Sequence, residues 1–160
     1  MSTPQDTETD PRTHSAGVVS LRPRLTVHDA AAAIAFYVGA LGAEEVERHT
    51  DDSGAVVHAD LRLGEFTLSL KDEVYGDLGP DAVGGTPVVL QVESADVDAL
   101  GARMEAAGAT VLFPIADHDY GRVGRLRDPF GHVWMLFQAA PDRAGERSRR
   151  RAAPLRTGRS

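Results

Sequence analysis

The chain repeats its own pattern once, about one half-chain apart. A shift of 66 residues places Leu68, Ser69 and Leu70 on Trp134, Met135 and Leu136. The same shift superposes the apolar positions of two predicted helices, aligning Ala31, Ile34, Val38, Leu41 and Gly42 with Val97, Leu100, Met104, Ala107 and Gly108. Two similar units imply a pseudo-two-fold arrangement, and a cleft between related half-sheets is a natural place for a ligand.

Composition limits the class of protein. A chain of 160 residues with 42% hydrophobic residues can close one sizeable domain, or two small units that share a sheet. There is no cysteine, which excludes a disulfide framework, a thiolate metal site and a cysteine nucleophile. No apolar run is long enough to span a membrane, and the polar start lacks the layout of a secretion signal. We therefore expect a cytoplasmic protein.

The net charge of −7 is unevenly distributed. Residues 140–160 hold seven arginines and two acidic residues, which leaves 10 basic and 22 acidic residues in the rest of the chain. That acidic body is a poor surface for nucleic acid. The sequence predicts a disordered tail over 1–19, a domain over 20–139 with units at 20–72 and 86–138, and a disordered basic tail over 140–160. The basic tail is interpreted as a solubilising extension, with RNA binding as the alternative.

The periodicities predict the order β-α-β-β-β in each unit, and hence an α+β fold. The first strand is expected over Leu21 to Val27, and the strand after the second helix near 109–113. Three strands of the first unit alternate apolar residues with a polar set, which is Arg22, Arg24, Thr26, His58, Asp60, Arg62, Thr67, Ser69 and Lys71. The apolar face must take the helix, so a curved mixed sheet would present the polar set as the lining of a cup. Ordinary solvent exposure would give the same alternation. The matching face of the last strand carries Val133, Met135 and Phe137, which favours a ligand pocket.

Three segments carry a family resemblance: PRLTVHDAAAAIAFYVGALGAEEVERH, VVHADLRLGEFTLSLKDE and GRLRDPFGHVWMLF. Together with the repeat, they resemble the glyoxalase/bleomycin-resistance/extradiol-dioxygenase superfamily, also called vicinal oxygen chelate proteins, and most closely its PhnB-like branch. The resemblance covers about residues 20–138 and implies a cup built from β-α-β-β-β units, usually in a homodimer. It implies either a metal-dependent enzyme or a metal-free protein that sequesters a drug.

In metalloenzymes of that family, ligands stand on the first and last strand of each unit. The resemblance places these positions at Arg22, Ser69, Val88 and Met135. A guanidinium stays charged, valine has no donor atom, a lone serine is a poor ligand and a thioether suits soft copper. The residues on either side of Val88 are no better ligands if the register slips by one. We therefore expect no metal and no other cofactor.

The sequence hypothesis is a metal-free protein that binds a small organic molecule, such as a natural product or an antibiotic, and is not an enzyme. The candidate ligand-binding residues are Arg22, Arg24, His58, Arg62, Ser69, Tyr120, Met135 and Phe137. Arg22 and Arg24 could bind a carboxylate of the ligand, or could instead pair with Asp60 or a glutamate within the fold. Phe113 is expected at a strand end, where it could stack on a flat ligand. One alternative is a metal-independent lyase or isomerase, in which His58 acts as acid or base beside Asp60. Another is a metal-dependent glyoxalase-like or dioxygenase-like enzyme. His58 and Asp60 share a strand face and could ligate together, but the sequence shows no third ligand.

Overall fold

The computed structural model describes residues 17–141, which form two β-α-β-β-β units. Unit one contains β1 (Arg24–Val27), α1 (Ala30–Leu41), β2 (Glu44–Thr50), β3 (Val56–Leu63) and β4 (Phe66–Asp72). Unit two contains β5 (Val89–Glu93), α3 (Val97–Ala106), β6 (Thr110–His118), β7 (Gly121–Arg127) and β8 (Val133–Ala139). The linker between the units contains a one-turn helix, α2 (Pro80–Val83), which the sequence reading missed. The predicted α+β class and the repeated element order are confirmed.

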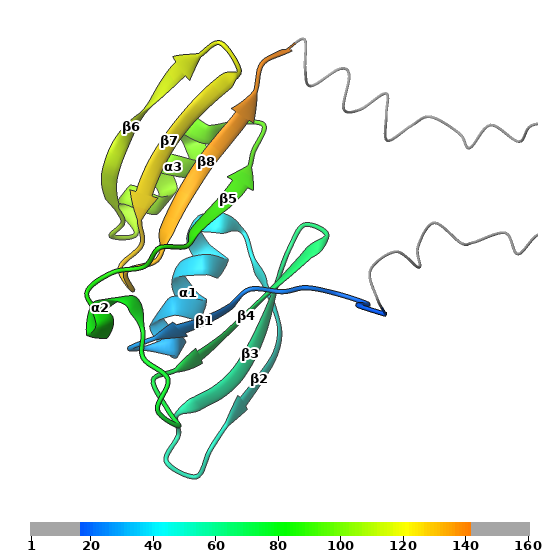
Figure 1. Ribbon diagram of the computed structural model, residues 1–160, viewed down its shortest axis with the longest axis vertical. Coiled ribbons are helices and arrows are strands. Elements are labelled where there is room, and N and C mark those ends of the chain that lie inside the picture. Colours follow the sequence, from blue (N-terminus) through cyan, green and yellow to red (C-terminus); the bar gives the residue numbers. More distant parts are fainter. Residues whose placement is uncertain (1–16, 142–160) are drawn as a thin grey trace, which may run out of the picture.

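Each unit forms its own four-stranded mixed sheet. The strand order is β1-β4-β3-β2 in sheet one and β5-β8-β7-β6 in sheet two, with one parallel pair in each. Figure 1 shows the sheets at opposite ends of the molecule, with α1 at their junction and α3 behind sheet two. The sheets do not close into one barrel. Among the described elements, β1 and β5 each have a strand neighbour on one side only, so each presents a free edge.

The two helices begin and pack in equivalent ways. Asp29 caps α1 by accepting a hydrogen bond from the Ala32 amide, and Asp96 caps α3 through the Ala99 amide. Their buried positions match at a spacing of 67 residues, which pairs Ala30, Ala33, Ile34 and Tyr37 with Val97, Leu100, Gly101 and Met104. The spacing of 66 predicted for the helices is therefore wrong by one. It holds for Ser69 and Met135, which pair with Arg24 and Gln91 in their sheets.

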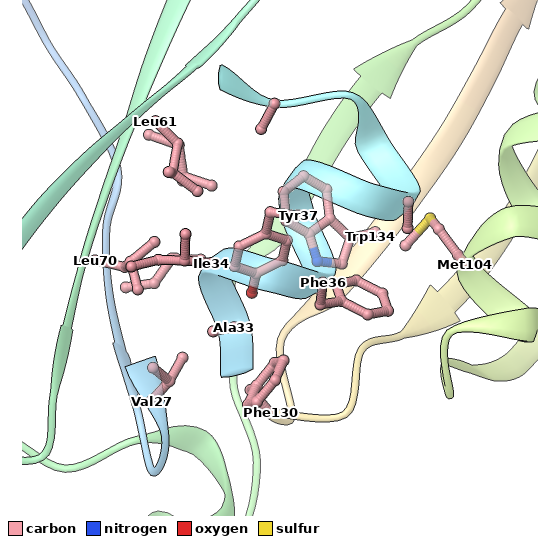
Figure 2. Packing of buried hydrophobic residues seen from close by; sticks show 14 of the residues in the cluster. Val27, Ala33, Ile34, Phe36, Tyr37, Leu61, Leu70, Met104, Phe130 and Trp134 are labelled. Atoms are coloured by element: carbon pink, nitrogen blue, oxygen red, sulfur yellow. The ribbon is translucent and has the colours of Figure 1, made fainter. Parts of the chain in front are cut away.

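One buried carboxylate joins the two units. Asp128, in the turn before β8, accepts hydrogen bonds from the Tyr37 hydroxyl at 2.6 Å and from Nε1 of Trp134 at 2.8 Å. It also accepts from the backbone amides of Phe130 and His132. The rings around it pack in one aromatic group, with the Tyr37 and Trp134 centroids 5.6 Å apart (Figure 2). Burial, the negative charge of Asp128 and the hydrogen bond to it raise the pKa of Tyr37 well above its ordinary value.

Element boundaries differ from the sequence expectation in two places. The first strand was expected from Leu21, but β1 begins at Arg24 and the preceding residues are exposed. The strand expected near 109–113 extends to His118, with register irregularities after Val111 and after Phe113. Within residues 17–141, no helix has the length and apolar character needed to cross a bilayer. The two predicted disordered tails lie almost entirely outside the described residues.

Candidate functional site

The face of sheet one that points away from α1 carries a row of polar residues. Strand pairing places one residue from each strand side by side in the row Arg24, Ser69, Asp60 and Glu47. The opposite face buries Leu25, Leu61, Leu68 and Leu70 under the helix. Because directly paired residues share a face, the backbone register alone brings the four polar side chains together.

His58 lies beside this row and its ring is held on both sides. Nη1 of Arg24 lies 3.1 Å from Nδ1 of His58, while Nε2 lies 3.2 Å from Oε1 of Glu47 and 3.3 Å from Oδ1 of Asp60. A guanidinium can only donate, so Nδ1 must accept and the ring proton belongs on Nε2. The contacts therefore assign the Nε2–H tautomer, with the proton directed at the two carboxylates.

Asp60 is the centre of this network. It is buried, and it accepts a hydrogen bond from the hydroxyl of the buried Ser69. Arg22 forms an ion pair with its other oxygen, with Nη1 2.8 Å from Oδ2. Four of the predicted ligand-binding residues, Arg22, Arg24, His58 and Ser69, are thus brought together around Asp60. In this structure their polar groups already bind one another.

Glu47, His58 and Asp60 form a cluster whose ligand atoms all lie within 4.8 Å of one another. Glu47 is the third potential ligand that the sequence did not show. The donor set nevertheless does not fit a divalent cation. Ligation through Nε2 of His58 would move the ring proton to Nδ1, where it would face the guanidinium of Arg24. The ion pair of Asp60 with Arg22 already neutralises one of the two carboxylates.

The four positions that the resemblance assigns to metal ligands are divided between the sheets. Arg22 and Ser69 both contact Asp60, whereas Met135 lies on β8. Val88 is exposed just before β5. Because β1 and β5 correspond at a spacing of 67, the residue equivalent to Arg22 is Val89, and the register slip considered from sequence has occurred. Valine lacks a donor atom in either register, so these positions do not fit the metal that the family implies.

The corresponding face of sheet two is largely apolar. Val133, Met135 and Phe137 of β8 lie on it and are partly exposed, while Trp134 and Leu136 are buried on the helix side. The buried position of Trp134 follows from its parity in β8, which is opposite to that of Met135. Tyr120, in the turn between β6 and β7, stacks on His118 with ring centroids 5.3 Å apart and planes at 11°. Met135, Phe137 and Tyr120 thus belong to sheet two, and not to the polar network of sheet one.

The remaining predicted residue, Arg62, is exposed on β3 and forms an ion pair with Glu44. A cavity of about 400 Å³ lies elsewhere, between β1, the linker and β5, with Leu78, Val83, Leu90 and His132 in its lining. Of the predicted ligand-binding residues only Arg24 lines it. This cavity therefore lies at the junction of the units, beside the free edges of β1 and β5.

Sequence reasoning missed two residues of these faces, Glu47 and Arg125. Glu47 escaped notice because every residue of β2 is exposed, so the strand shows no apolar alternation that would indicate its faces. Arg125 and Phe113 lie on the open face of sheet two, paired with each other across β6 and β7. Phe113 was expected at a strand end but lies within β6. The alternation in β7 could have identified Arg125, since Val123, Arg125 and Arg127 have the same parity.

Comparison with known proteins agrees with this architecture. Two uncharacterized proteins, from Mycobacterium bovis (strain ATCC BAA-935 / AF2122/97) and Mycobacterium tuberculosis (strain ATCC 25618 / H37Rv), are each 44% identical to this chain over 125 residues. The match covers 74% of this chain, with 82% of the first protein and 74% of the second.

Solved structures share the fold. TioX from Micromonospora sp. ML1 has a TM-score of 0.62 at 26% identity, covering 77% of this chain and all of TioX. A PhnB protein from Bacillus cereus, described as a putative 3-demethylubiquinone-9 3-methyltransferase, has a TM-score of 0.62 at 21% identity, covering 75% and 99% of the two chains. Residues 17–136 match the family model described as Glyoxalase/Bleomycin resistance protein/Dioxygenase superfamily. The chain belongs to this superfamily.

Proposed function

We propose that this protein is a metal-free member of the superfamily that binds a small organic molecule and sequesters it unchanged. The observation that carries the proposal is the chemistry of the four family metal positions, where Arg22, Ser69, a β5 valine and Met135 stand. A natural product or an antibiotic is the ligand class that the sequence resemblance implies. The open face of sheet two, with Met135 and Phe137 partly exposed, offers the apolar contact area that such a ligand needs.

A homodimer is part of the proposal. The edges of β1 and β5 are free in the described chain, and Leu78, Val83 and Val88 beside them are exposed. A second copy that covers these edges would remove unpaired backbone groups and apolar surface from water. Light scattering at micromolar concentration should give a mass near twice 17.1 kDa. A strict monomer would contradict this part of the proposal. The cytoplasmic location remains a prediction from the sequence.

Elemental analysis tests the absence of metal. After dialysis against buffer supplemented with zinc, nickel, manganese and iron salts, and then against metal-free buffer, we expect far less than one metal ion per chain. About one bound ion per chain would overturn the proposal in favour of the metal-dependent alternative. A His58→Gln variant distinguishes a true site from adventitious binding, because it would lose an ion held at the Glu47, His58 and Asp60 cluster.

A thermal-shift screen against metabolites and antibiotics tests the binding function. A ligand should raise the melting temperature and be recovered chemically unchanged. Met135→Glu should reduce affinity, because it places a charge on the apolar face of sheet two. Val38→Glu, on the exposed side of α1, adds the same charge away from both sheet faces and should leave binding intact. If Met135→Glu and Val38→Glu bind equally well, the ligand does not use this face.

One observation favours the metal-independent enzyme as a second candidate. The ring of His58 is oriented by Arg24 on one side and by two carboxylates on the other, as an acid or base needs to be. In that case a His58→Ala variant should still bind the ligand but fail to convert it. Chromatography of the ligand after incubation with the wild-type protein distinguishes the candidates, because only the enzyme yields a product.

A further inference from the structure

The open face of sheet two carries a row of residues equivalent to the polar row of sheet one. Strand pairing sets Gln91 of β5 beside Met135 of β8, Met135 beside Arg125 of β7, and Arg125 beside Phe113 of β6. The row of sheet one is polar throughout. In this row, by contrast, the thioether of Met135 and the ring of Phe113 lie on the two sides of Arg125. The two halves of the repeat have therefore acquired different chemistry at the same place in the fold.

Arg125 lies against Phe113, with its guanidinium carbon 5.6 Å from the ring centroid. The ring itself is 60% exposed, so much of its surface remains open to a further partner. Within residues 17–141, no carboxylate forms an ion pair with Arg125. By contrast, Arg22, Arg62 and Arg122 each have a carboxylate partner.

A partly buried guanidinium among apolar groups has lost part of its hydration, and an anion would restore the missing interactions. Its planar fork matches a carboxylate through two parallel hydrogen bonds. A flat apolar group attached to that carboxylate would reach Met135 directly opposite and Phe137 two residues further on, where sulfur and ring contacts favour an aromatic system. Arg22 and Arg62 of sheet one already pair with carboxylates of the protein, so they are less available to bind the carboxylate of a ligand.

We propose that the open face of sheet two binds an aromatic carboxylate, with the carboxylate on Arg125 and the aromatic ring on Met135 and Phe137. This inference rests on the proposed binding function and specifies its ligand class. It also makes Arg125 the residue that selects anionic over neutral ligands.

Calorimetric titration of the full chain with 2-naphthoate and with its neutral analogue 2-naphthamide tests the inference. The wild-type protein should bind 2-naphthoate about tenfold more tightly or better, the effect of a charge-assisted hydrogen bond. Arg125→Gln should bind both probes with the affinity of the amide. Arg127→Gln removes the same charge two residues along β7, on an exposed side chain, and should keep the preference. Arg125→Lys, which keeps the charge without the fork, should show an intermediate preference.

Equal binding of the two probes by the wild-type protein would overturn the inference, as would an Arg125→Gln variant that keeps the preference for 2-naphthoate. Failure of both probes to bind at millimolar concentration would also overturn it. The proposed function would survive these results if a neutral molecule from the ligand screen bound and Met135→Glu weakened it. A melting curve of each variant shows that it is folded before titration.

Discussion

The hydrogen bond from Tyr37 to Asp128 spans the two units and can be removed by deleting one oxygen atom. The donor belongs to α1 in unit one and the acceptor to the β7–β8 turn in unit two, and both residues are buried. A hydrogen bond to a charged group contributes about 1.5–3 kcal/mol. In a Tyr37→Phe variant, Asp128 keeps its bonds from Trp134 and two backbone amides, so the carboxylate is not left without partners. We therefore expect a loss of about 1.5–2 kcal/mol.

Urea unfolding monitored by tryptophan fluorescence measures the loss, since Trp134 is the single tryptophan and lies beside Tyr37. The melting temperature should fall by roughly 4–8 °C for a domain of this size. The control is Tyr75→Phe, which deletes the same oxygen from a side chain that is 81% exposed. Its stability should stay within about 0.5 kcal/mol of the wild type. If the two variants behaved alike, the hydrogen bond would not stabilise the junction of the units.

The same contact predicts a dependence on alkaline pH. The pKa of Tyr37 is raised in the folded protein, chiefly by burial, so the folded state holds this proton more tightly than the unfolded chain. The resulting stability is fully present below the ordinary tyrosine pKa of about 10 and is lost as pH rises from there toward the higher folded value. The stability difference between wild type and Tyr37→Phe should therefore shrink above about pH 10. A constant difference across that range would contradict the assignment.

Three further expectations concern packing, the tail and the open face of sheet two. Gly124→Ala should destabilise the fold by about 1–3 kcal/mol, because the new methyl group would lie 2.5 Å from a side-chain carbon of Ile115, whereas Gly39→Ala meets no atom and should stabilise α1 by about 0.5–1 kcal/mol. Thermal melts of the pair check both signs. Deleting residues 141–160 should leave the melting temperature and ligand binding nearly unchanged, and a large fall would show that the segment packs on the domain. Phe113→Leu should weaken 2-naphthoate binding, because it removes the ring that lies against Arg125. The stability should change little, because the ring is mostly exposed.

Strand parity was the most predictable feature of this protein. Alternation with period two identified Leu25, Leu61, Leu70 and Trp134 as side chains under the helices, and all four are buried. The pattern is reliable because one face of each sheet must cover a helix, so a single misplaced residue would expose the apolar set. The separation into two units was predictable from the repeat, and the fold class from the order of the helix and strand periodicities.

The partners of the polar residues could not be predicted in the same way. Asp128 contacts Tyr37 across 91 positions of sequence, and Arg22 contacts Asp60 across 38, a pairing that the sequence offered only as an alternative to a ligand contact. Neither pairing leaves a periodic signal, because each depends on how separate elements pack. Glu47 lies on an edge strand with no buried residue, so its position near His58 required the register of β2 with β3. Candidate residues can thus be proposed from faces, while the network among them needs coordinates.

The one-residue difference between the spacing of the helices and the spacing of β4 and β8 has an evolutionary consequence. Counted from the helix caps, Asp29 lies 13 residues before Gly42, whereas Asp96 lies 12 before Gly108. An insertion or deletion inside a strand would turn every later side chain to the wrong face. At the end of a helix the change is absorbed by the last turn and its cap, where a left-handed glycine such as Gly42 redirects the chain. The one-residue difference that follows the helices therefore lies at the helix end, where a change of one residue leaves both sheet faces intact.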